Sequence, residues 1–143
     1  MINKTATAHW SGSLKKGKGQ ISTDSGALST QPYGFNTRFE DKPGTNPEEL
    51  IGAAHAGCFW MAFSMILANY DALADDIDTK ATVSVEEKDG GFAITKIHLE
   101  MTAKIPGLSE SDFQEAATTA KENCPVSKVL AGAEITMDAK LAD

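Results

Sequence analysis

The longest apolar stretch of the chain extends from Leu50 to Ala68 and contains no charged residue. It follows Asn46 and Pro47, which suit the N-cap and the first position of a helix. This pattern predicts a helix from Pro47 to about Tyr70. Because apolar residues occupy all of its sides, we expect the helix to be buried on every side. A monomer of 15.2 kDa could hardly enclose it, whereas a dimer could.

Alternating apolar and polar positions predict strands on both sides of this helix. Within Phe92–Ile105 the apolar phase changes near Thr95, which predicts a β-bulge, because one extra residue reverses the faces of a strand. Asp89-Gly90-Gly91 is typical of a hairpin turn, and Phe35–Thr45 is expected to be irregular. Residues 4–31 are expected to form short strands with Gly-rich turns, among them Lys18–Thr23 and Ala27–Gln31. The other predicted strands are Lys80–Lys88, Phe92–Ile105 and Glu134–Leu141.

Two shorter helices are expected in the last third of the chain. Ser109 suits the N-cap of a helix that continues to about Asn123, and Cys124-Pro125 begins a second helix that ends near Gly132. Strands are largely segregated from helices along the sequence. This order predicts one α+β domain over residues 1–143 with a mostly antiparallel sheet.

The chain is acidic, with 13 Lys and Arg against 20 Asp and Glu and a net charge of −7. Its few cations do not cluster, so we expect no binding to nucleic acid. No secretory signal is recognisable at its start, which favours a cytoplasmic location. The long uncharged helix also reaches the length of a membrane span. It is rich in alanine, contains His55 and is followed by aspartates without flanking lysines, so no membrane association is expected.

The two cysteines, Cys58 and Cys124, lie in neither a Cys-x-x-Cys nor a zinc-ribbon spacing. In a reducing compartment they are reactive or inert thiols rather than a permanent disulfide. In its apolar helix Cys58 could be no more than a small buried side chain. Cys124 precedes Pro125 at a helix start, where the helix dipole favours the thiolate and lowers a thiol pKa, although a capping or core cysteine is the simpler alternative.

Three further residues could contribute charge. Arg38 is the only arginine of the chain and lies between Phe35 and Phe39, which indicates a partly apolar cleft rather than a solvated loop. Glu48 and Glu49 fall in the first turn of the long helix, where carboxylates ordinarily stabilise the helix dipole.

His55 precedes Cys58 by three residues and shares its helix face. The two could act as base and nucleophile of a hydrolase, but a histidine packed in the core is the more usual case. A zinc site built from His55, Cys58 and Cys124 lacks a fourth ligand at a recognised spacing, since His9 and His98 fall on predicted strands. We therefore expect no bound metal, and these residues alone leave the function open.

Three segments together resemble the family of osmotically inducible protein C, the OsmC/organic hydroperoxide resistance group. The resemblance covers essentially the whole chain and is closer to the OsmC branch, because the arginine follows Tyr-Gly-Phe-Asn-Thr. A Thr-Asn-Pro-Glu-Glu-Leu helix start ten residues before a cysteine is specific, and so is a late Cys-Pro-Val-Ser. The matching segments are Gln31–Phe39, Gly44–Phe59 and Asn123–Ser127.

The resemblance implies a thiol peroxidase that reduces organic hydroperoxides in oxidative and osmotic stress defence. In the family, the cysteine matching Cys58 attacks the peroxide, and the one matching Cys124 resolves the sulfenic acid as a disulfide. The residues matching Arg38 and Glu48 activate the attacking thiol. The alternative to an enzyme is a non-enzymatic redox-sensing or stress-induced protein that uses the same cysteine pair.

The resemblance also implies partners and a fold. The family fold is an intertwined homodimer in which a mostly antiparallel sheet wraps two long central helices. No cofactor is bound, and an external dithiol restores the thiols, for which family members use lipoyl-bearing proteins. Phe35, Phe39, Phe59 and Met61 would favour a hydroperoxide with a hydrocarbon tail. We expect Cys58 to be a buried attacker.

Helix geometry adds one expectation about the dimer. Glu48 and Cys58 are ten residues apart on one predicted helix, so their Cα atoms differ by about 15 Å along its axis. A glutamate side chain is too short for that distance. We therefore expect composite sites, with Arg38 and Glu48 from one subunit and Cys58 and Cys124 from its partner.

Overall fold

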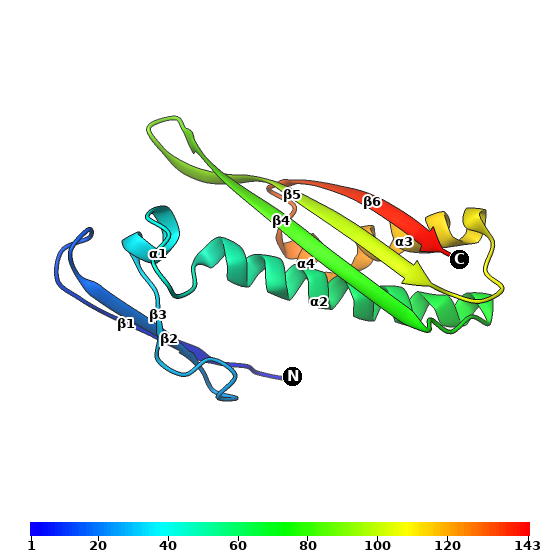
Figure 1. The fold of residues 1–143 in the computed structure, drawn as a ribbon, viewed down its shortest axis with the longest axis horizontal. Helices are drawn as coiled ribbons and strands as arrows, with labels where there is room; N and C mark the ends of the chain where they lie inside the picture. Colours follow the sequence, from blue (N-terminus) through cyan, green and yellow to red (C-terminus); the bar gives the residue numbers. More distant parts are fainter. The chain divides into compact units, whose positions relative to one another are not determined.

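The computed structural model describes residues 1–143, which divide into two units, Met1–Leu50 and Ile51–Asp143 (Figure 1). Both units contain a three-stranded sheet, with the strand orders β1-β2-β3 and β4-β5-β6. The α+β class is confirmed, but the chain forms two sheets. The expectation of one domain over residues 1–143 stays a prediction.

The first unit consists mainly of an antiparallel sheet and a short helix. The strand predicted at Lys18–Thr23 is confirmed as β2, whereas the strand predicted at Ala27–Gln31 is wrong except for Gln31, which begins β3. The Leu28 backbone instead bonds to Thr23, which closes a loop and leaves Leu28 unable to pair with a neighbouring strand. The elements are β1 (Ala6–Ser11), β2 (Lys18–Thr23), β3 (Gln31–Pro32) and α1 (Phe35–Phe39).

The segment Phe35–Thr45, expected to be irregular, begins with the single helical turn of α1. Thr37 stabilises this turn, because its hydroxyl accepts a hydrogen bond from the Gly34 N–H at 2.8 Å and lies 2.7 Å from the Thr45 carbonyl. Such local bonds form without a long apolar pattern, so the periodicity of the sequence carries no sign of them.

The long helix α2 begins at Pro47 as predicted and continues into the second unit. Asn46 caps it, because its Oδ1 accepts a hydrogen bond from the Glu49 N–H at 2.7 Å. The cap of α3 is also confirmed, since Ser109 accepts from the Asp112 N–H at 3.1 Å. The remaining elements are α2 (Pro47–Leu67), η1 (Ala68–Tyr70), β4 (Asp76–Lys88), β5 (Gly91–Lys104), α3 (Glu110–Asn123), α4 (Pro125–Val129) and β6 (Glu134–Ala142).

The hairpin of β4 and β5 has the predicted bulge. Ser84 pairs with Lys96 while Val85 pairs with Ile94, so Thr95 is the extra residue. The turn is confirmed at Asp89-Gly90, where both residues have positive φ, as a two-residue turn between right-twisted strands requires. β6 joins the other side of β5 in parallel, so three of the four strand pairings are antiparallel.

The core of the second unit lies between α2, α3 and the sheet β4-β5-β6. Phe63 packs edge-on against Phe113 of α3, with ring centroids 5.8 Å apart, and stacks near Phe59 at 6.2 Å. The buried positions of α2 recur every three or four residues and form one stripe. They are Glu48 in the first unit and Gly52, His55, Phe59, Phe63 and Leu67 in the second.

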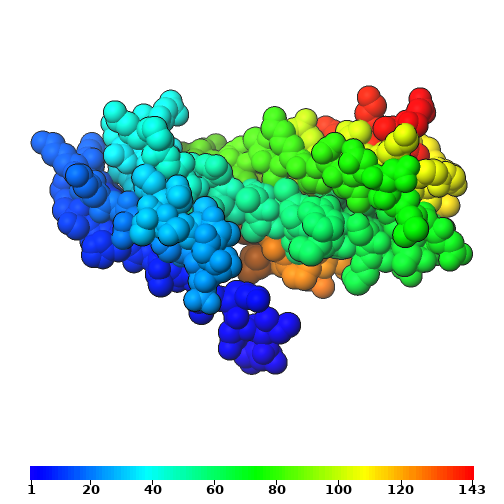
Figure 2. All heavy atoms as spheres, turned by 60° about the horizontal axis from the view of Figure 1, so that its bottom comes forward, coloured from blue at the N-terminus to red at the C-terminus, as the bar shows by residue number.

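The opposite side of α2 is exposed, with Trp60, Met61 and Met65 accessible to 46%, 55% and 73%. Figure 2 shows the surface of α2 between β4 and α4. Burial on every side is therefore wrong for the single chain, because the second unit provides only enough sheet and helix to cover one face. By length and composition, Pro47–Tyr70 could cross a membrane. The same helix contributes its packed stripe to the core of the second unit.

Candidate active site

The two cysteines meet in the second unit as free thiols, with their Sγ atoms 2.8 Å apart. Cys58 lies on α2. Cys124 occupies the corner between α3 and α4, where its N–H donates to the Ala120 carbonyl at 3.0 Å and Pro125 starts the next helix. Sixty-six residues of sequence separate the two thiols, and the packing of α4 beside α2 brings them together (Figure 1).

The exposure of Cys58 differs from the expectation of a buried attacker. Cys124 is fully buried, while Cys58 is half-buried in the single chain. The reason is the orientation of α2: Cys58 lies at the edge of its buried stripe, next to the exposed face of Trp60 and Met61. In the single chain, the thiol expected to attack a substrate is thus the more accessible of the two.

The local environment does not by itself activate Cys58. Burial raises the pKa of the Cys58 thiol, and its hydrogen bond with Cys124 raises the pKa further. The backbone N–H of Val126 acts in the opposite direction, because a hydrogen bond to sulfur stabilises the thiolate. None of these three contacts places a positive charge beside the Cys58 sulfur.

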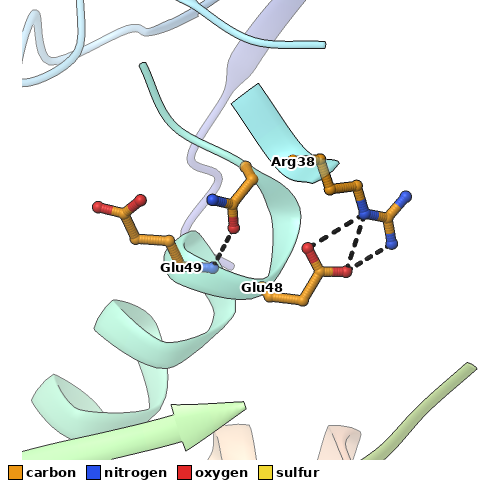
Figure 3. Close-up of polar contacts among 4 residues, drawn as sticks. Arg38, Glu48 and Glu49 are labelled. Carbon is orange, nitrogen blue, oxygen red and sulfur yellow. Dashed lines mark hydrogen bonds and ion pairs between the residues drawn. The ribbon is translucent and has the colours of Figure 1, made fainter. Parts of the chain in front are cut away.

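Arg38 and Glu48 form a bidentate ion pair in the first unit (Figure 3). Arg38 Nε lies 3.1 Å from both carboxylate oxygens, and a terminal nitrogen lies 2.5 Å from Oε1. The Glu48 side chain is 10% exposed and that of Arg38 30%. Glu48 is the one buried carboxylate of the chain, and its two oxygens fix the plane of the guanidinium. Glu49 points away from the pair in Figure 3.

A cavity of about 400 Å³ lies beside Arg38 within the first unit. Its lining is mainly aromatic and aliphatic. The Arg38 guanidinium also lies over the Phe39 ring, with its central carbon 5.1 Å from the centroid. Phe35 and Phe39 therefore lie beside Arg38, as the sequence predicted. Lining residues that the sequence did not indicate are Trp10, Leu14, Tyr33 and Pro47.

His55 is fully buried, with its Nε2 atom 2.7 Å from the Ser127 hydroxyl. Burial lowers the pKa of His55, so it is neutral at pH 7. His98 lies on an exposed face of β5, beside Thr136 and Asp138. No group of three or more His, Cys, Asp or Glu side chains gathers where it could hold a metal.

The structure thus forms two pairs from the predicted residues, Arg38 with Glu48 and Cys58 with Cys124. Ser127 is a neighbour of the thiol pair that sequence reasoning missed. Its spacing was the available signal, because it follows Cys124 by three residues as His55 precedes Cys58 by three.

Comparison with known proteins agrees with this arrangement. Residues 39–140 match the family of OsmC-like proteins. The chain is 55% identical to peroxiredoxin OsmC of Escherichia coli (strain K12) over 140 residues, which cover 98% of this chain and 97% of that protein. The chain belongs to the OsmC family. The resemblance predicted from three segments is confirmed.

Two further proteins are similar to this chain, one in sequence and one in structure. Organic hydroperoxide resistance protein OhrB of Bacillus subtilis (strain 168) is 32% identical over 124 residues, 86% of this chain and 87% of OhrB. The structure of an OsmC-like protein of unknown function from Vibrio cholerae has a TM-score of 0.76 at 18% identity, covering 97% of this chain and 99% of that one. The OsmC-like fold is thereby confirmed, and the names of the first two relatives support the prediction of a peroxidase.

Proposed function

We propose that this OsmC-family chain is a thiol peroxidase that reduces organic hydroperoxides to alcohols. The observation that carries the proposal is the pair of free thiols 2.8 Å apart, one half-buried and one fully buried. A peroxidase with two cysteines needs a reachable thiol to attack and a second thiol close enough to resolve the product. The named relatives, a peroxiredoxin and an organic hydroperoxide resistance protein, support the same chemistry.

The reaction takes place in two steps on the cysteines. The Cys58 thiolate attacks one peroxide oxygen, the O–O bond breaks, and the alcohol leaves with a proton, so that Cys58 becomes a sulfenic acid. Cys124 then attacks the Cys58 sulfur, the S–O bond breaks, and water leaves with the proton of the Cys124 thiol. An external dithiol reduces the resulting disulfide and is itself oxidised.

Arg38 supplies the positive charge that the thiol pair lacks. A guanidinium near Cys58 lowers the thiol pKa and can donate hydrogen bonds to the peroxide oxygens. Glu48 holds the guanidinium in one plane through its two carboxylate oxygens. Lysine would keep the charge but not this planar fork.

The charge comes from a second copy of the chain. Glu48 and Cys58 are separated by ten residues of α2, a rise of about 15 Å along the axis, which a glutamate side chain does not bridge. The exposed apolar face with Trp60, Met61 and Met65 supports burial of α2 in a homodimer. Each site then combines Arg38 and Glu48 of one subunit with the thiols of the other.

The cavity beside Arg38 supports a substrate with a hydrocarbon tail, because Trp10, Phe35 and Phe39 line it. Of the four apolar residues expected at the site, Phe59 is fully buried in the core and cannot contact a substrate in this structure. Met61 is exposed on the face assigned to the dimer. The proposed location is the cytoplasm, and the proposed reductant is a dithiol protein of the lipoyl-bearing type, without a bound cofactor.

A steady-state assay with excess dithiol tests the function. Cumene hydroperoxide should be turned over many times per chain and faster than hydrogen peroxide, because only the former has an apolar group to occupy the cavity. Oxidation of one equivalent without turnover would favour a redox sensor with the same cysteine pair. Cys58→Ser is the matched blank for uncatalysed peroxide loss.

A further inference from the structure

The buried pair His55–Ser127 has no part in the chemistry described above. His55 is 0% exposed and Ser127 5%, and their side chains meet at 2.7 Å. The other ring nitrogen, Nδ1, is buried without a hydrogen-bond partner. A neutral ring that carries its proton on Nε2 avoids an unpaired buried N–H, so Nε2–H donates to the Ser127 hydroxyl.

This bond lies one helical turn from the thiol pair on both helices. His55 precedes Cys58 by three residues on α2, and Ser127 follows Cys124 by three at the start of α4. Residues three apart on a helix are neighbours on one face. The Val126 N–H adds a third contact, because it donates to the Cys58 sulfur. The segment from Cys124 to Ser127 is thus attached to α2 at successive points.

The short helix α4 needs such attachment. It contains five residues, Pro125–Val129, and a helix of that length has little stability of its own. Only three residues separate the end of α3 at Asn123 from Ser127. The end of α3 fixes the backbone of Cys124 through the Ala120 carbonyl, and the contacts of α4 with α2 hold the other side of this corner. His55–Ser127 is the side-chain hydrogen bond among the contacts of α4 with α2.

We propose that His55 and Ser127 are positioning residues that hold α4 against α2 so that Cys124 reaches the Cys58 sulfenic acid. The proposal rests on the peroxidase function given above. It concerns the second step, in which the Cys124 sulfur bonds to the Cys58 sulfur, the S–O bond breaks and water leaves. Peroxide attack by Cys58 does not require Cys124, so its rate should not depend on the hydrogen bond between His55 and Ser127.

Two amide substitutions distinguish the loss of the hydrogen bond from the loss of the imidazole ring. In His55→Gln the amide occupies the position of Nε2 and can still donate to Ser127. In His55→Asn the amide occupies the position of Nδ1 and cannot reach Ser127. Ser127→Ala, with Ser127→Thr as its control, removes the bond from the other side if a histidine variant does not fold. Thermal unfolding shows which variants are native.

The measurement is a single turnover with one equivalent of cumene hydroperoxide, quenched at intervals with dimedone and a thiol-alkylating reagent. Intact-mass analysis then counts reduced, sulfenic and disulfide chains. We expect His55→Asn and Ser127→Ala to accumulate sulfenic acid and to form the disulfide roughly tenfold more slowly, as for one lost hydrogen bond. His55→Gln should stay near the wild-type rate, and peroxide consumption should stay within about twofold in all variants.

Two results would overturn the positioning role: equal disulfide rates in His55→Gln and His55→Asn, or equal slowing of both steps. In the Ser127→Ala background the Gln and Asn variants should become indistinguishable, because their difference passes through that hydroxyl. If the wild-type chain consumed no peroxide, the proposed function would fail. The positioning role of His55 and Ser127 would then be tested with diamide as the oxidant. Slower disulfide formation in His55→Asn than in His55→Gln would support that role, and equal rates would contradict it.

Discussion

The thiol pair and the ion pair are held in place by different forces. Cys58 and Cys124 meet because α2, α3 and α4 enclose a packed core, in which Cys124, Phe59 and Phe63 are fully buried. Arg38 and Glu48 lie in the small first unit, on a single turn of helix and a helix start, where their own bidentate contact fixes them. Packing places the nucleophile, and electrostatics places the charge.

This difference has a chemical consequence. Burial positions two sulfur atoms closely, but it also raises the Cys58 pKa, which opposes formation of the thiolate. The guanidinium favours the thiolate but has no nucleophile of its own. Each region therefore lacks what the other supplies, and on our account the assembly of two chains joins them.

The largest effect is expected from the thiols. Cys58→Ser should abolish peroxide reduction, since it removes the nucleophile. Cys124→Ser should consume about one peroxide per chain and then stop with a sulfenic acid that dimedone traps, because nothing resolves it. Sustained dithiol-dependent turnover by Cys58→Ser would assign the attack to another group.

The next largest effect is expected from separating the two chains. Met65→Glu places a charge on the exposed apolar face of α2, where an unpaired charge would be costly to bury. We expect this variant to sediment as a monomer and to lose most of its activity, although its second unit stays folded. Thr118→Glu, on the exposed side of α3, is the matched control and should change neither property. An active monomer would place the whole site in one chain.

A smaller effect is expected from the charged pair. Arg38→Ala should raise the Cys58 pKa, and a rise of one pH unit in that pKa corresponds to about 1.4 kcal/mol of lost thiolate stabilisation. The rate of Cys58 alkylation would then reach its half-maximum at a higher pH, and peroxide reduction at pH 7 would fall roughly tenfold for such a rise. Glu48→Gln should have a weaker effect in the same direction, since the charge remains but its orientation loosens. An unchanged alkylation profile in Arg38→Ala would remove the arginine from the mechanism.

Sequence patterns predicted the second unit better than the first. In the second unit the turn at Asp89-Gly90, the bulge at Thr95 and the cap of α3 each depend on a few adjacent residues with strong preferences, so they are visible in the sequence. The turn of α1 depends instead on one threonine hydroxyl that bonds to both ends of a loop. Such bonds leave no periodic trace.

The candidate site divides in the same way. Sequence reasoning predicted the site residues Arg38, Glu48, Cys58 and Cys124 because they lie in recognisable segments. The family resemblance also implied the two contacts among them, Arg38 with Glu48 and Cys58 with Cys124. Their exposure was not predictable, because the buried stripe of an entirely apolar helix depends on which face meets the sheet. For the same reason the bond between His55 and Ser127, 72 residues apart, became visible only in the folded chain.

The most direct test of the account mixes an inactive chain, Cys58→Ser, with an impaired chain, Arg38→Ala. A heterodimer of Cys58→Ser and Arg38→Ala subunits, isolated through two different tags, keeps one complete site under the shared-site arrangement, because both lesions fall in the other site. Its activity should be about half that of the wild-type dimer, as two equivalent sites in a symmetric dimer require. A confirmed heterodimer with no more activity than its two parents would contradict the account, because it would show that each site is built within a single chain.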